Sequence, residues 1–96
     1  MLQEEDDIRF EGGDGSTTEN AIIIRGAHFD LAATYAIFYY MTQRFGQKDV
    51  DWKLIYQAHG VFNEKDIDTY AIKLADGVEK TLYFDITESF GKFPSL

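Results

Sequence analysis

Four carboxylates in the C-terminal third of the chain could support general acid–base chemistry. They are Asp66, Asp68, Asp85 and Glu88. Because these residues lie near the predicted ends of strands, their side chains could converge at one end of a sheet. The chain contains 17 acidic residues among 96, however, so some convergence is expected by chance. We predict that the chain is not an enzyme, with a small carboxylate-based enzyme or ligand binder as an alternative.

The two histidines, His28 and His59, do not form a recognisable metal-binding pattern. A zinc or iron site needs at least three ligands in fixed geometry, and the spacing suggests no third ligand for either histidine. The chain has no cysteine, which excludes disulfides and thiolate sites and fits a reducing compartment. We therefore expect a cytoplasmic protein without metal or cofactor, with His28 before a helix and His59 on the outer face of a sheet.

The glycine-rich segment Gly12–Ser16 could be a phosphate-binding loop, because successive backbone N–H groups can surround an anion. It lacks the lysine of a P-loop and the G-x-G-x-x-G spacing of a dinucleotide-binding turn. Nearby acids, such as Asp14 and Glu19, would repel phosphate. A structural loop is therefore expected here.

The net charge of −8 is concentrated at the N-terminus, where residues 1–20 carry seven acids and one base, Arg9. Nucleic-acid binding is disfavoured because the nine basic residues are scattered along the chain. The first residues are acidic rather than basic and apolar, and the apolar runs are short, so neither export nor membrane insertion is expected. An acidic segment could instead contact a basic protein partner.

The hydrophobic pattern predicts one α+β domain, with one helix packed on an antiparallel sheet in the order β-β-α-β-β-β. Asp30 is a candidate N-cap and Gly46 a candidate C-cap for the helix. We expect residues 1–7 to form a frayed acidic N-terminus, residues 8–90 the domain and residues 91–96 a C-terminal tail. The predicted strands are 8–10, 21–25, 52–59, 68–75 and 80–87, and the predicted helix is 31–45.

Periodicity also predicts which faces are buried. On the helix, a stripe should face the core, and it consists of Leu31, Tyr35, Phe38, Thr42 and Phe45. The last three strands alternate with period two, which favours a meander with one apolar face. In the first of these strands, Tyr56 shares the core face with Trp52, whereas Ile55 and His59 lie on the outer face.

The aromatic content of 16% exceeds what one helix-on-sheet core of this size requires. Tyrosine is frequent at protein interfaces because its ring is apolar while its hydroxyl stays hydrated. We therefore predict an interface on the outer helix flank or on the second sheet face. Its candidate residues are Ile37, Tyr40, Met41, Ile55 and Tyr83.

The segment FEGGDGSTTENAIIIRG, residues 10–26, resembles a segment of small uncharacterised bacterial proteins. In those proteins a GGDGS loop and an E-[NK]-A-I turn lead into an isoleucine-rich strand, which here correspond to residues 12–16, 19–22 and 23–24. The resemblance covers about a fifth of the chain and implies a bacterial origin. It implies no activity and no catalytic residue.

These features favour a non-enzymatic, acidic protein-binding domain. Its most concrete form is an inhibitor or immunity-type protein that neutralises a basic partner, since aromatic anchors with complementary charge make tight interfaces. A homo-oligomeric structural domain is an alternative, in which an apolar helix or sheet face is the subunit contact.

Overall fold

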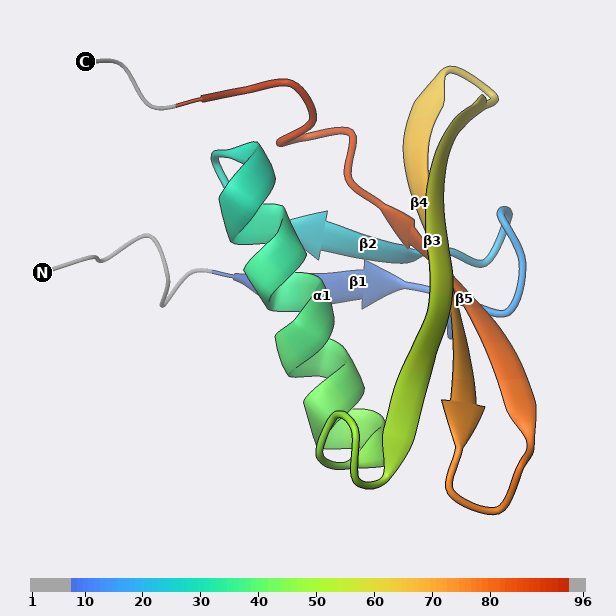
Figure 1. Ribbon diagram of the computed structural model, residues 1–96. Helices are drawn as coiled ribbons and strands as arrows, with labels where there is room; N and C mark the ends of the chain where they lie inside the picture. The colour runs from blue at the N-terminus through green and yellow to red at the C-terminus, as the bar shows by residue number, and fades with distance from the viewer. Residues whose placement is uncertain (1–7, 94–96) are drawn as a thin grey trace, which may run out of the picture.

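The computed structural model describes residues 8–93. The predicted order of elements is confirmed, and the chain is a single α+β domain (Figure 1). The predicted frayed segment 1–7 and the last three residues of the predicted tail lie outside the described residues. The elements are β1 (Arg9–Gly12), β2 (Ile22–Arg25), α1 (Asp30–Phe45), β3 (Trp52–Phe62), β4 (Lys65–Leu74) and β5 (Glu79–Asp85).

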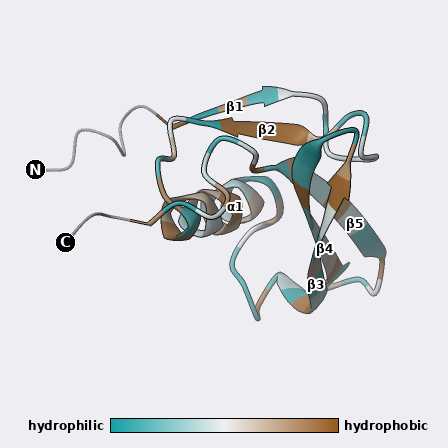
Figure 2. Ribbon diagram, turned by 90° about the horizontal axis from the view of Figure 1, so that it is seen from above, coloured by the Kyte–Doolittle hydropathy of each residue, from teal (hydrophilic) through white to brown (hydrophobic). Residues whose placement is uncertain are grey.

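All five strands join one sheet in the order β1-β2-β5-β4-β3. The β1–β2 pair is antiparallel, and β3, β4 and β5 form the predicted antiparallel meander. The two units meet where β2 runs parallel to β5, with Ile22 opposite Phe84. The sheet is therefore mostly antiparallel with one parallel pair, and α1 lies on one side of it, below β1 and β2 in Figure 2.

The helix begins one residue earlier than predicted. Phe29 occupies the N-cap position and makes no side-chain cap, while Asp30 is the first helical residue. The Asp30 carboxylate is engaged elsewhere, because it accepts a hydrogen bond from the Gly91 backbone N–H at 3.1 Å. Gly46 ends the helix at the predicted position with a φ of 105° and a ψ of −158°, which lies outside the left-handed helical region but is a conformation that glycine adopts easily.

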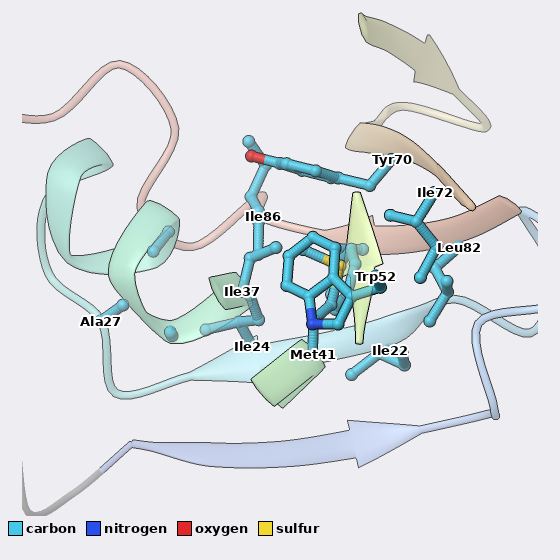
Figure 3. Close-up of a cluster of buried hydrophobic side chains, with 13 residues drawn as sticks. Ile22, Ile24, Ala27, Ile37, Met41, Trp52, Tyr70, Ile72, Leu82 and Ile86 are labelled. Carbon is cyan, nitrogen blue, oxygen red and sulfur yellow. The ribbon is translucent and has the colours of Figure 1, made fainter. Parts of the chain in front are cut away.

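The face that α1 buries differs from the predicted stripe. Its buried residues are Ala33, Ala36, Ile37 and Met41. The small alanines let the helix backbone approach the sheet, and Ile37 and Met41 fill the core around Trp52 and Ile24 (Figure 3). The prediction was right for Phe38 and Phe45, which are half-buried and pack against the core, and wrong for Leu31, Tyr35 and Thr42, which are exposed. Because this helix is apolar on almost all sides, periodicity does not single out one face.

A β-bulge in β3 reverses part of the predicted sheet pattern. Leu54 is opposite Ile72, but the next regular pair is Tyr56 opposite Ala71, which leaves Ile55 as the extra residue. An inserted residue moves every later side chain to the other face of the sheet. Tyr56 consequently faces away from α1, and His59, predicted on the outer face, lies on the helix side opposite Asp68.

Candidate protein-binding groove

The solvent-facing side of α1 is an apolar surface without charge. Leu31, Tyr35 and Tyr39 repeat every four residues and are 59%, 67% and 60% exposed. The charged residues of α1 are Asp30 and Arg44, one near each end of the helix. A helix that faces water normally carries charged side chains on its outer face, so this face is unusual for a solvated surface.

A groove of about 980 Å³ lies along this helix face. Its walls come from the start of β1, from the residues at the start of α1 and from the C-terminal segment. The large apolar side chains that line it are Phe10, Phe29, Leu31, Tyr35, Tyr39 and Phe93. Asp30 is the one charged residue among the described residues that line the groove. The groove therefore presents aromatic anchors beside a single carboxylate.

The wall that Phe93 forms is held by hydrogen bonds to the first turn of α1. The Asp30 backbone N–H donates to the Lys92 carbonyl at 3.0 Å, and the Asp30 carboxylate accepts from Gly91 N–H. Asp30 thus uses both its main chain and its side chain to fix residues 91–93, the described part of the predicted tail. This contact gives the groove a fixed second wall.

Two of the five predicted interface residues cannot be at a surface. Ile37 and Met41 are fully buried in the core, so the prediction that they are exposed was wrong. Tyr40 is half-buried, and its ring packs against Phe10 at a centroid distance of 5.1 Å and against Phe84 at 5.7 Å. The core-facing side of α1 therefore contributes no interaction surface.

Ile55 and Tyr83 remain accessible but do not line the groove. Ile55 is 47% exposed at the bulge of β3. Tyr83 is half-buried on β5 and is paired with Thr69 on β4. The structure therefore does not bring the five predicted residues together, and an interface at Ile55 or Tyr83 stays a prediction.

Two of the four candidate carboxylates meet near His59. The His59 Nε2 atom lies 3.0 Å from Asp66 Oδ1, and the imidazole stacks on Phe90 with the ring centroids 4.2 Å apart. Burial raises the pKa of Asp68 to about 6; the charges of Asp30 and Asp66 act in the same direction, and His59 opposes them. This polar cluster attaches the segment after β5 to the sheet.

Asp85 is opposite Ile67 in the sheet and therefore lies on the other face from Asp66 and Asp68, whereas Glu88 contacts Gly26 and Arg25. Asp85 is buried and accepts hydrogen bonds from the Thr87 backbone N–H at 3.0 Å and hydroxyl at 2.6 Å. Glu88 accepts from the Gly26 N–H and lies 3.8 Å from the Arg25 guanidinium. Each of these carboxylates thus has a structural partner, and the four do not converge at one site.

The remaining candidates for a metal or phosphate site are His28 and the glycine-rich loop. His28 is exposed before the helix, and within residues 8–93 no group of three or more His, Asp or Glu side chains is arranged to hold a metal ion. In the glycine-rich loop, Ser16 N–H donates to Asp14 Oδ1 and Gly15 N–H to the Asn20 carbonyl. Hydrogen bonds from Ser16 lower the pKa of Asp14. These internal bonds agree with the expected structural loop.

Sequence reasoning missed the groove because it placed Leu31 and Tyr35 in the core. One signal was present, since only two of the 16 residues in α1 are charged. The contribution of Phe93 could not be foreseen, because it depends on the long-range contact between Asp30 and residues 91–92.

No family model, curated protein or solved structure matches this chain. The resemblance of residues 10–26 to small bacterial proteins therefore stays a prediction. Among the described residues, no helix has the length and apolar character needed to cross a membrane.

Proposed function

We propose that this chain is a non-enzymatic protein-binding domain, and that the groove beside α1 receives the apolar side of a basic segment of its partner. The observation that carries the proposal is the uncharged, exposed stripe of Leu31, Tyr35 and Tyr39. Exposed aromatic side chains around a concave surface are typical anchors of protein interfaces. An apolar patch of this kind on a small domain marks an interaction site.

The charge near the groove favours a basic partner. Asp30 lines the groove, and Glu4, Glu5, Asp6 and Asp7 directly precede Ile8, another residue of its lining. In the sequence, at most three residues separate any of these four acids from Ile8. Lysine or arginine residues that flank an apolar anchor would find complementary charge there.

The finer form of this proposal is an inhibitor or immunity-type protein that binds and neutralises a basic protein. The small size of the domain, its net charge of −8 and its aromatic groove support this form. The lack of cysteine supports action in a reducing compartment such as the cytoplasm.

Affinity capture from a lysate of the source organism tests the proposal. The bait is compared with Tyr35→Lys, which places a cation on the groove, and with Val78→Lys, a matched control at an exposed position in the β4–β5 turn. We expect the wild type and the control to retain the same basic protein at low salt and release it at high salt, because charge attraction is screened. Retention of that protein by Tyr35→Lys would contradict the proposal.

Removal of residues 1–7 tests the contribution of charge to binding separately from that of the apolar groove residues. With the retained protein as ligand, the truncated chain should associate more slowly, and its association rate should depend less on salt. The dissociation rate should change little, because the groove residues remain. An unchanged association rate would show that the N-terminal acids have no electrostatic role.

The same helix face could instead pair with a second copy of the chain, as in the homo-oligomeric alternative. A leucine and two tyrosines on an uncharged stripe suit helix-on-helix packing across a two-fold axis. In that case the wild type is a dimer in sedimentation equilibrium, and Tyr35→Lys is a folded monomer.

A further inference from the structure

The strand β3 forms one edge of the sheet and is largely exposed. It is 11 residues long, pairs with β4 on one side, and within residues 8–93 no strand lies on its other side. Edge strands offer unpaired backbone N–H and C=O groups to any strand that can approach. The opposite edge, β1, has only four residues. The long edge is therefore the better candidate for strand addition.

The bulge at Ile55 divides this edge and defines the part that can pair. From Tyr56 to Phe62 the register with β4 is unbroken, which gives a regular segment of seven residues centred on His59. The segment contains no Asp, Glu, Lys or Arg. Two copies of a chain with a net charge of −8 can therefore approach each other here without placing fixed like charges in contact.

We propose that β3 pairs antiparallel with β3 of a second copy, about a two-fold axis at His59, so that two sheets of five strands become one continuous sheet. In this register Tyr56 lies opposite Phe62 of the second copy, and Ala58 lies opposite its Gly60. The symmetry repeats both pairs on the other side of the axis. The interface is thus formed by backbone hydrogen bonds and two aromatic cross-strand pairs.

Side-chain size selects this register. On the face turned away from α1, the segment reads Tyr56, Ala58, Gly60, Phe62, which is large, small, small, large. The Phe62 ring lies over Gly60, because a Cβ atom on Gly60 would be 2.9 Å from that ring. A two-fold axis at His59 therefore places large side chains opposite large ones and small opposite small, which favours close pairing.

Neighbouring registers do not fit. Directly opposite residues in an antiparallel pair share a face of the sheet. A register that keeps the faces matched can therefore differ only by moving the axis by a whole residue, which shifts each residue's partner by two positions. An axis at Ala58 places Tyr56 opposite Gly60 and brings the bulge at Ile55 into the paired region. An axis at Gly60 places Phe62 opposite Ala58 and extends the pairing into the turn at Asn63 and Glu64. His59 is therefore the centre that keeps the whole pairing regular.

Two double variants and sedimentation equilibrium test both the edge and the register. Tyr56→Lys/Phe62→Lys places lysine opposite lysine twice, and should raise the dimer dissociation constant by about tenfold or more. Tyr56→Lys/Phe62→Glu places lysine opposite glutamate twice, and should restore much of the dimer. Both wild-type side chains are exposed, 54% and 44%, so the fold tolerates the changes. A monomeric wild type, or a dimer that both variants leave unchanged, would overturn the proposal.

Hydrogen exchange gives a second measurement on the unmodified protein. The amides of residues 56–62 that point away from β4 should exchange more slowly at high protein concentration than after dilution, because pairing protects them. Equal exchange at both concentrations would also overturn the proposal. Tyr35→Lys should leave this protection and the dimer unchanged, since the groove lies on α1, so failure of the groove proposal and failure of this one are distinguishable.

Discussion

Two residues at the tip of the β3–β4 hairpin hold a backbone conformation that glycine adopts more easily. Asn63 has a φ of 52° and Glu64 a φ of 65°, the pair of positive values that a type I′ turn requires. Asparagine tolerates this region, but glutamate is strained there. Glu64→Gly should therefore raise the free energy of unfolding by roughly 0.5–1 kcal/mol, measured by urea denaturation.

A matched glycine substitution in a strand should act in the opposite direction. Glu79 is exposed at the start of β5, where no positive φ is needed. Glu79→Gly should lower the free energy of unfolding by roughly 0.5–1 kcal/mol. If both glycine variants lower it, the turn does not have the described backbone conformation.

Asp68 should make stability depend on pH. Its pKa is about 6 in the folded chain and 3.8 in the ordinary case, so the folded state binds the proton more tightly. The stabilisation from protonated Asp68 is complete below about pH 4 and is lost as the pH rises to about 6. Asp68→Asn removes this titration, so relative to wild type the variant should gain stability at neutral pH but not at pH 4.

Urea midpoints measured across this pH range check the prediction. The control is Glu79→Gln, which changes an exposed acid without affecting the half-buried cluster around His59. Parallel pH curves for wild type and Asp68→Asn would show that Asp68 does not titrate in this range.

Most boundaries of the helix and strands could be predicted from the sequence. The face that α1 turns to the sheet and the faces on which the β3 side chains lie could not. Gly46, for example, marks the end of α1, because that end depends on local backbone geometry. The orientation of α1 depends on which of its faces packs more closely against the sheet. The small alanines allow closer packing than the larger tyrosines, so the alanine face is the buried one. The bulge at Ile55 is set by the pairing of β3 with β4, for which the alternating sequence gives no sign.

In the candidate sites too, the residues could be predicted from the sequence, but their placement by long-range contacts could not. The four candidate carboxylates could be named from the sequence, but of the four only Asp66 and Asp68 interact with His59. His59 was assigned to the wrong face because the bulge lies between it and Trp52. The parallel contact of β2 with β5 was also beyond prediction, because it depends on how the chain returns after α1.

The orientation of α1 can be tested by two truncations on opposite sides of the helix. Ile37→Ala removes a fully buried side chain and should cost about 2–5 kcal/mol of unfolding free energy. Leu31→Ala removes a side chain that is mostly exposed and should cost no more than about 0.5 kcal/mol. Thermal or urea denaturation of the two variants measures the difference. Equal losses, or a larger loss for Leu31→Ala, would mean that the helix is rotated.

At the scale of the whole molecule, the two proposed contact surfaces lie on different parts of the fold. The groove lies between α1, the start of β1 and residues 91–93, whereas the free edge of β3 is at the far end of the strand order. A dimer formed through β3 would therefore carry two open grooves. Two linked grooves would strengthen binding to a partner that presents two basic segments.

Photo-cross-linking in living cells tests whether the groove beside α1 binds a protein partner. A photoreactive phenylalanine analogue replaces Tyr35 in one variant and Val78 in the other, since both positions are exposed but only Tyr35 lines the groove. We expect a cross-link from position 35 to a basic protein, with no such product from position 78. The same product from both positions, or none from position 35, would contradict the claim that the groove beside α1 binds a protein partner.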